Sequence, residues 1–110
     1  MINFAMSLIL IMMNDINSQI EEILRKIGKK SFVQHLYPEL RKDINVTIED
    51  IVSRHPEYNE YTLNSQKSRL SKARSIFREG KEKEALINII YSEKTDEDVL
   101  KQAQEYIDKL

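Results

Sequence analysis

The sequence predicts an all-α fold, a compact bundle of five or six short helices. Three observations support this prediction. Apolar residues recur three and four positions apart along most of the chain, and no segment shows the alternation typical of a half-buried strand. The 110 residues include only two glycines and two prolines, most of them where a helix is expected to end. With 41% apolar and 32% charged residues, the composition is that of a folded domain with one helical core.

The first thirteen residues, MINFAMSLILIMM, form an apolar segment that precedes the single helical domain expected over residues 14–110. They include only two polar side chains. A membrane-spanning helix needs about 20 apolar residues, and a signal peptide needs a basic start and a cleavage site. Two explanations stay open: Met12 or Met13 is the natural start, or the segment is an apolar helix buried against the domain or a second subunit. Membrane insertion is less favoured than either.

The first two helices of the domain are predicted on either side of Gly28. An apolar stripe indicates a helix from Asn14 or Asp15 to residue 27, and Gly28 supplies a left-handed stop. Lys29 and Lys30 are expected to cap the carbonyls of this helix, or to make a second phosphate contact if they share a face with Arg74. Ser31 is expected to cap a second helix, which Pro38 should shorten, break or kink near Tyr37. The inward residues of the second helix are predicted to be Phe32, Val33, Leu36 and Leu40.

The middle of the chain predicts a short helix followed by a long one. Thr47-Ile48-Glu49-Asp50 resembles a capping box, and Pro56 should end the helix that it opens. The segment HPEYNEY, residues 55–61, is expected to be a polar connection. Thr62 is a good N-cap for a helix that reaches Gly80.

Two further helices are predicted at the C-terminal end. One covers residues 81–92 and buries Ala85, Leu86, Ile89 and Ile90. The other starts at Thr95, with acidic residues in its first turn where the helix dipole favours them. Its predicted inward side chains are Val99, Leu100, Ala103, Tyr106, Ile107 and Leu110.

The long helix carries an unusual concentration of positive charge. The formal charge of the whole chain is −1, yet residues 63–83 hold seven of its seventeen Lys and Arg. At 100° per residue, the predicted core side of this helix is Leu63, Leu70, Ala73 and Phe77. Lys67, Arg74 and Arg78 then lie on one flank, and the side opposite the core is Asn64, Ser68, Ser71, Lys72 and Ser75. Small outward side chains bordered by cations allow close approach to an anionic polymer.

Residues 47–80 resemble the helix-turn-helix pair of bacterial DNA-binding proteins. The resemblance implies that Asn64, Gln66, Lys67 and Ser68 face bases, while Arg69, Lys72 and Arg74 hold phosphates. The charge pattern adds Lys67 and Arg78 as phosphate contacts, with base readout then carried by Asn64, Gln66 and Ser68. We therefore expect a small bacterial or mobile-element DNA-binding regulator, cytoplasmic and not an enzyme, with double-stranded DNA as partner.

A second hypothesis uses the same residues without nucleic acid. The cationic flank could be solvated, with Arg74 and Arg78 pairing with Glu79, Glu82 and Glu84. The protein would then be a non-catalytic homo-oligomeric interaction module, or would bind an acidic protein partner. In both hypotheses we expect a homo-oligomer, associating through the apolar N-terminus and through Leu86, Ile89, Ile90 and Tyr91.

Other kinds of site find little support. The chain has no cysteine, and neither His35 nor His55 has a second His at ligand spacing. His35 and Glu39 are one helical turn apart, but two ligands do not make a closed metal site, so we expect structural or surface roles for both histidines and no metal. There is no glycine-rich phosphate loop, no nucleophile motif and no sign of a cofactor.

Overall fold

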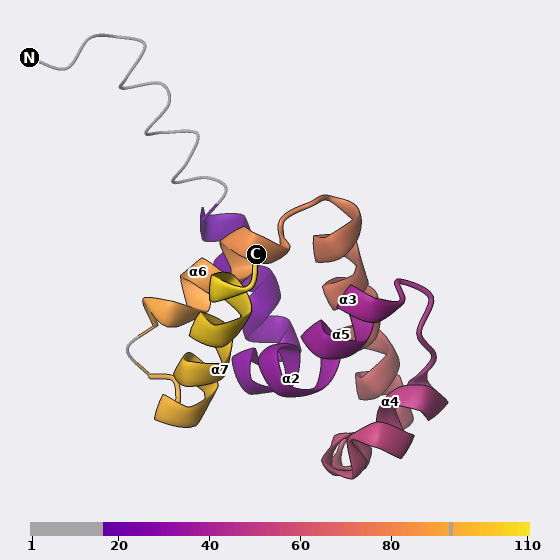
Figure 1. Ribbon diagram of the computed structural model, residues 1–110. Helices are drawn as coiled ribbons and strands as arrows, with labels where there is room; N and C mark the ends of the chain where they lie inside the picture. The colour runs from indigo at the N-terminus through magenta and orange to yellow at the C-terminus, as the bar shows by residue number, and fades with distance from the viewer. Residues whose placement is uncertain (1–16, 93) are drawn as a thin grey trace, which may run out of the picture.

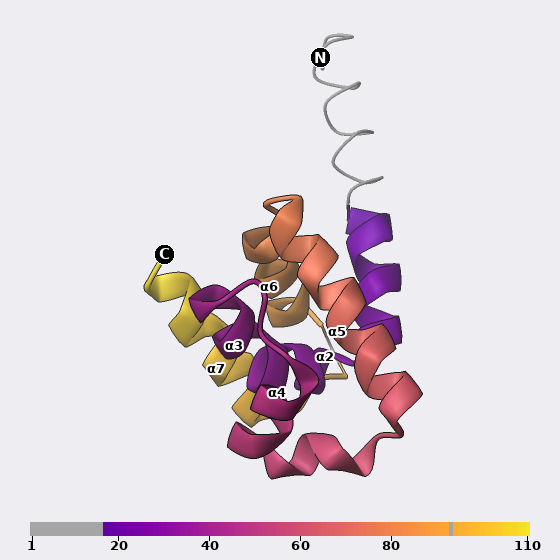
Figure 2. The same ribbon diagram turned by 90° about the vertical axis from the view of Figure 1, so that its right-hand side faces the viewer.

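The computed structural model describes residues 17–92 and 94–110, and the secondary structure in these ranges is helical, with no strand. The all-α prediction is confirmed. Within these ranges no helix combines the length and the apolar character needed to cross a membrane. The expectations for the apolar N-terminal segment concern residues outside the described part of the chain. Figures 1 and 2 show the helices from two directions at right angles.

The first helix, residues 17–27, ends as predicted at Gly28. Gly28 has a φ of 90°, a positive backbone angle that residues with a Cβ rarely adopt. Its N–H donates to the carbonyl of Leu24 at 2.8 Å. Ile20, Leu24 and Ile27 are fully buried, so the predicted apolar stripe is the core face of this helix.

Residues 29–42 form one continuous helical stretch through the centre of the bundle. It consists of α2 (Lys29–Ser31), the π-helical turn η1 (Phe32–Leu36) and α3 (Tyr37–Lys42). The predicted interruption near Tyr37 is therefore a wide π turn and not a break. Pro38 is the second residue of α3, and the wider turn before it accommodates the proline ring and its missing N–H. The predicted inward residues of this stretch are all buried: Phe32, Val33, Leu36 and Leu40.

The short and long helices of the middle segment are α4 (Ile48–Arg54) and α5 (Leu63–Arg78). The capping box is present, because Asp50 N donates to Thr47 Oγ1 at 3.2 Å and Thr47 N to Asp50 Oδ2 at 3.4 Å. Thr62 caps α5 in the predicted way by accepting from Ser65 N at 3.2 Å. The connection between the two helices contains a 3-10 helix, η2 (Pro56–Glu60), whose Tyr58 is buried in the core. The connection was expected to be polar, and the buried Tyr58 was not predicted.

The core face of α5 differs from the predicted one. The buried residues are Gln66, Leu70, Ala73 and Ile76. Leu63, which we expected in the core, is 56% exposed, because the first residue of α5 lies off the stripe that Gln66, Leu70, Ala73 and Ile76 bury. Phe77 is only partly buried. The buried stripe is thus rotated away from Leu63, and the outward residues change with it.

The C-terminal helices α6 (Glu82–Ile90) and α7 (Glu97–Asp108) pack against each other, and α7 also packs on η1. The turn η1 also contacts α5, and α5 packs in addition on α3, α4 and α6 (Figure 1). Leu86 and Ile89 are fully buried and cannot form the self-association surface that we expected. Leu110 is 57% exposed, so its predicted core position is also wrong.

Candidate nucleic-acid interface

The outer face of α5 consists of Asn64, Lys67, Ser68, Ser71, Lys72 and Arg78. All are exposed except Lys72, which is half-buried and whose ammonium donates to Ser68 Oγ. Figure 2 shows α5 as a long rod running beside the helix of residues 17–27. The short side chains of Ser68 and Ser71 lie at the centre of this face, and the cations lie on both sides of them.

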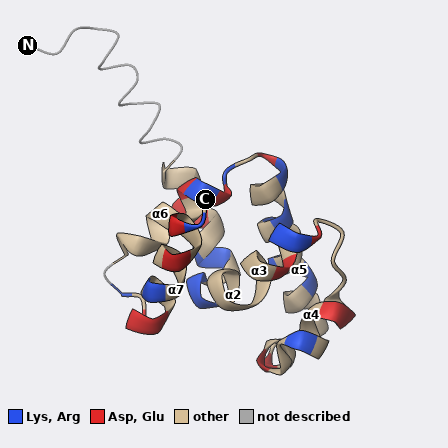
Figure 3. Ribbon diagram, viewed as in Figure 1, with Lys and Arg blue, Asp and Glu red and all other residues tan. Residues whose placement is uncertain are grey.

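No carboxylate neutralises this face within the described residues. Residues 63–78 contain no Asp or Glu, as Figure 3 shows by colour. The ion pairs that we expected between α5 arginines and nearby acids do not form in the described part of the chain, where Glu79 pairs instead with Lys81 at 3.1 Å. Lys67, Lys72 and Arg78 likewise make no ion pair with any residue that the structure describes. A polyanion would therefore meet cations that need not first break an ion pair within the protein.

Gln66 does not lie on the outer face, contrary to the expected role in base contact. It is 3% exposed, and its amide nitrogen donates to the carbonyls of Tyr58 at 3.2 Å and Tyr61 at 3.0 Å. In return Tyr58 Oη donates to the Gln66 carbonyl at 2.8 Å. Burial raises the pKa of Tyr58 to about 12, which keeps its hydroxyl protonated as the donor. These bonds join η2 to the start of α5.

Arg69 is also occupied inside the protein. Its guanidinium lies 3.8 Å from the centre of the Tyr61 ring, and Nη1 donates to the carbonyl of Ile27. Arg69 thus caps the end of helix 17–27, the role that we expected for Lys29 and Lys30. Tyr61 Oη in turn is 2.7 Å from Oγ of Ser31, which is buried within a continuous helix and does not cap it.

Arg74 fastens α5 to the loop that precedes α4. Its Nε donates to the carbonyl of Ile44 at 2.8 Å and its Nη2 to that of Val46 at 2.6 Å. Both acceptors are backbone carbonyls of the loop between α3 and α4, outside any helix. The predicted phosphate contacts of Arg69 and Arg74 are therefore wrong. Both guanidinium groups bind backbone carbonyls inside the protein, and both arginines hold α5 in place.

A buried polar cluster lies behind the connection between α4 and α5. Glu39 is 3% exposed and accepts from Arg54 Nε at 2.8 Å, while His55 Nε2 is 3.4 Å from its other oxygen. His35 is also buried, with Nε2 3.4 Å from Glu57 Oε1 but without hydrogen-bond geometry. Burial lowers the pKa of His35, although the nearby Glu57 opposes this effect.

These histidines do not form a metal site. No group of three or more potential ligands comes together in the described ranges. The ring centroid of His35 lies 5.6 Å from that of Tyr58 and 5.7 Å from that of His55. The cluster therefore supports η2, and through Tyr58 it supports the start of α5.

Comparison of the sequence with protein-family models, with curated proteins and with solved structures gave no match. Of the eight residues expected to contact DNA, the structure leaves Asn64, Lys67, Ser68, Lys72 and Arg78 on the outer face of α5. Ser71, which the expected contacts did not include, lies at the centre of the same face.

Proposed function

We propose that this protein is a DNA-binding regulator that lays the outer face of α5 against a duplex. In this proposal Lys67, Lys72 and Arg78 contact phosphates, and Asn64 and Ser68 approach base edges near the start of the helix. An exposed Asn side chain can form a bidentate pair with adenine. The observation that carries the proposal is the cationic face without carboxylates, in a chain whose formal charge is −1.

Two features of the structure support a rigid docking surface. Arg74 and Arg69 fasten the middle of α5 to neighbouring segments. Gln66 and Tyr58 fix its first turns against η2. A surface held in place before binding loses little conformational entropy when the partner arrives.

Three phosphate contacts are few for a specific complex. We therefore propose that two copies bind together, each placing one α5 on the duplex. Sedimentation of the free protein and of its complex measures the number of copies. A single copy per duplex at saturation would contradict this part of the proposal.

The salt dependence of binding tests the main proposal. If each copy neutralises three phosphates, log K should fall against log salt with a slope of about −2.7 per copy. Between 50 and 200 mM salt, the affinity per copy should then decrease about 40-fold. Fluorescence anisotropy with a labelled duplex measures this slope.

A matched pair of triple variants separates local charge from total charge. Lys67→Gln, Lys72→Gln and Arg78→Gln together should reduce the slope nearly to zero. Lys83→Gln, Lys101→Gln and Lys109→Gln remove the same charge from exposed sites outside α5 and should leave the slope unchanged. Equal losses in the two variants, or no duplex binding at low salt, would reject the DNA proposal. The second result would favour the interaction module, with an acidic protein or its own copies as partner.

A further inference from the structure

A second cationic site lies on another part of the molecule. A cavity of about 320 Å³ opens where helix 17–27, α2 and the segment before α7 meet. None of its lining residues belongs to α5. Four of them are cations and two are carboxylates: Arg25, Lys29, Lys30, Lys94, Glu21 and Asp96.

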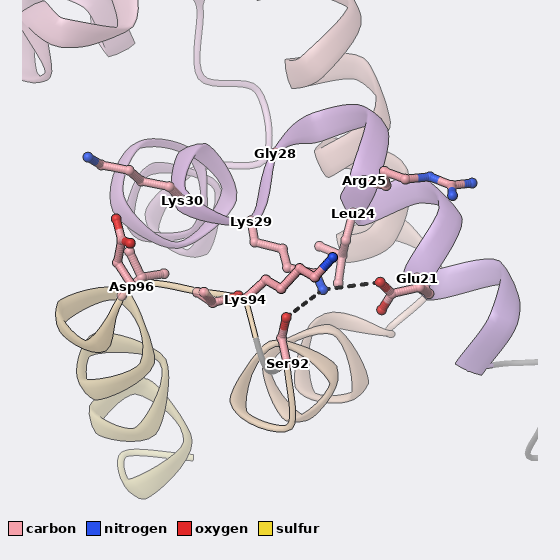
Figure 4. A pocket seen from close by; sticks show the side chains of 11 residues that line it. Glu21, Leu24, Arg25, Gly28, Lys29, Lys30, Ser92, Lys94 and Asp96 are labelled. Atoms are coloured by element: carbon pink, nitrogen blue, oxygen red, sulfur yellow. Dashed lines mark hydrogen bonds and ion pairs between the residues drawn. The ribbon is translucent and has the colours of Figure 1, made fainter.

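Lys29 is the centre of this cavity. Its side chain is only 19% exposed, and its ammonium donates to Glu21 Oε1 at 3.1 Å and to Ser92 Oγ at 2.9 Å. Figure 4 shows these two contacts, with the Lys94 side chain extending toward them and Lys30 and Arg25 pointing outward on either side. Because Ser92 accepts from Lys29, its own hydroxyl proton remains available for an anion.

The position of these lysines is not explained by helix stability. Lys29 and Lys30 stand at the start of the helical stretch 29–42, the end at which the dipole favours anions and disfavours cations. Their carbonyl-capping role is filled by Arg69. Glu21 compensates the charge of Lys29, but Arg25, Lys30 and Lys94 form no ion pair with any residue that the structure describes, so the lining residues carry a net positive charge.

A neighbouring cavity extends this site toward an exposed aromatic ring. It measures about 470 Å³ and shares four lining residues with the first: Glu21, Lys29, Ser92 and Lys94. Its other walls include Ile87 and Tyr91, which are 38% and 82% exposed. Asn88 also lines it, and the side-chain oxygen of Asn88 is buried without a hydrogen-bond partner.

We propose that the two cavities together bind a nucleoside monophosphate. The phosphate lies against Lys29 and Lys94 and accepts from the Ser92 hydroxyl. The base stacks on the Tyr91 ring, and Asn88 accepts a hydrogen bond from its edge. The two volumes are each within the range of small-molecule sites, about 300–1,000 Å³.

Calorimetric titration of the full chain tests this site at constant ionic strength, with adenosine monophosphate, ribose 5-phosphate, inorganic phosphate and adenosine as probes. Adenosine monophosphate should bind about tenfold more tightly than ribose 5-phosphate, because stacking on an aromatic side chain contributes measurably. Inorganic phosphate and adenosine should bind more weakly than adenosine monophosphate. Equal affinity for inorganic phosphate and adenosine monophosphate would overturn the nucleotide assignment.

Two variants separate the halves of the site. Lys94→Gln should weaken both phosphorylated probes about tenfold, since it removes a charge-assisted contact. Tyr91→Ala should weaken adenosine monophosphate about tenfold and change ribose 5-phosphate less than about twofold. Both side chains are exposed, so neither substitution should unfold the protein.

A control and a gain of affinity complete the test. Lys83→Gln removes the same charge from an exposed position outside both cavities and should change no affinity. Glu21→Gln removes the carboxylate nearest the phosphate and should tighten its binding. No binding of adenosine monophosphate at about 10 mM, or equal weakening by Lys94→Gln and Lys83→Gln, would overturn the proposal. No duplex enters these measurements, so their failure is independent of the α5 proposal.

Discussion

Substitution of Arg74 separates a role inside the fold from a role on DNA. Arg74→Met removes two charge-assisted hydrogen bonds, to the carbonyls of Ile44 and Val46, while keeping a long apolar stem. Water can reach the freed carbonyls because Arg74 is only half-buried, so we assign about 1 kcal/mol to each bond. The expected loss of about 2 kcal/mol corresponds to a decrease in Tm of roughly 8 °C for a domain of this size.

Arg78→Met is the matched control for this experiment. Arg78 is exposed and makes no hydrogen bond or ion pair with the residues that the structure describes, so its loss should change Tm by less than about 2 °C. On DNA the order should reverse. Arg78→Met should reduce the size of the salt slope by about 0.9, and Arg74→Met should leave it unchanged. Thermal unfolding and anisotropy titrations of both variants give the answer. A stable Arg74→Met with a reduced slope would refute the structural role assigned to Arg74.

Three further predictions concern the folded state. Because folding lowers the pKa of His35, the unfolded chain binds more protons than the folded protein near this pKa, so the free energy of unfolding should decrease as pH falls below 6.5. Urea unfolding from pH 7.5 to 5.5 measures this decrease, and His35→Gln should show a weaker pH dependence. Gly28→Ala places a Cβ 2.9 Å from a guanidinium nitrogen at a φ of 90°, whereas the Cβ of Gly80→Ala, at a φ of 68°, meets no atom within 4 Å. Gly28→Ala should therefore destabilise the protein by more than the roughly 1 kcal/mol expected for Gly80→Ala. Equal midpoints of urea unfolding for the two variants would contradict this. Gln66→Met removes the hydrogen bonds to the carbonyls of Tyr58 and Tyr61, at about 1 kcal/mol each, so it should lower stability by about 2 kcal/mol without changing the salt slope.

The helix ends were predictable because their signals are local. A glycine at a positive φ, a capping box and a threonine N-cap each act within three or four residues, and Gly28, Thr47 and Thr62 all have the expected roles. The apolar stripe of helix 17–27 and the buried side of α6 follow from helical periodicity alone. The sequence therefore predicted the fold class and the order of the helices.

The composition of the site was less predictable because its contacts join distant segments. Arg69 and Arg74 have the same local pattern as a phosphate-binding arginine, but their acceptors lie 42 and 28 to 30 positions earlier in the chain. Gln66 is buried because the η2 turn presents two carbonyls to it. An angle on a helical wheel does not reveal which neighbouring backbone will satisfy a polar side chain. Lys67 and Arg78 were placed correctly on the exposed surface, since neither has a hydrogen-bond or ion-pair partner in the described part of the chain.

The most direct test of the proposed interface is a residue-by-residue footprint of a duplex on the isotope-labelled protein at low salt. We predict that the largest changes in backbone amide shifts fall on the outer face of α5, at Asn64, Lys67, Ser68, Ser71 and Arg78. The amides around Lys29 and Ser92 should change little. Changes centred on the cavities at Lys29, or no changes at all on α5, would contradict the proposal that this face binds DNA.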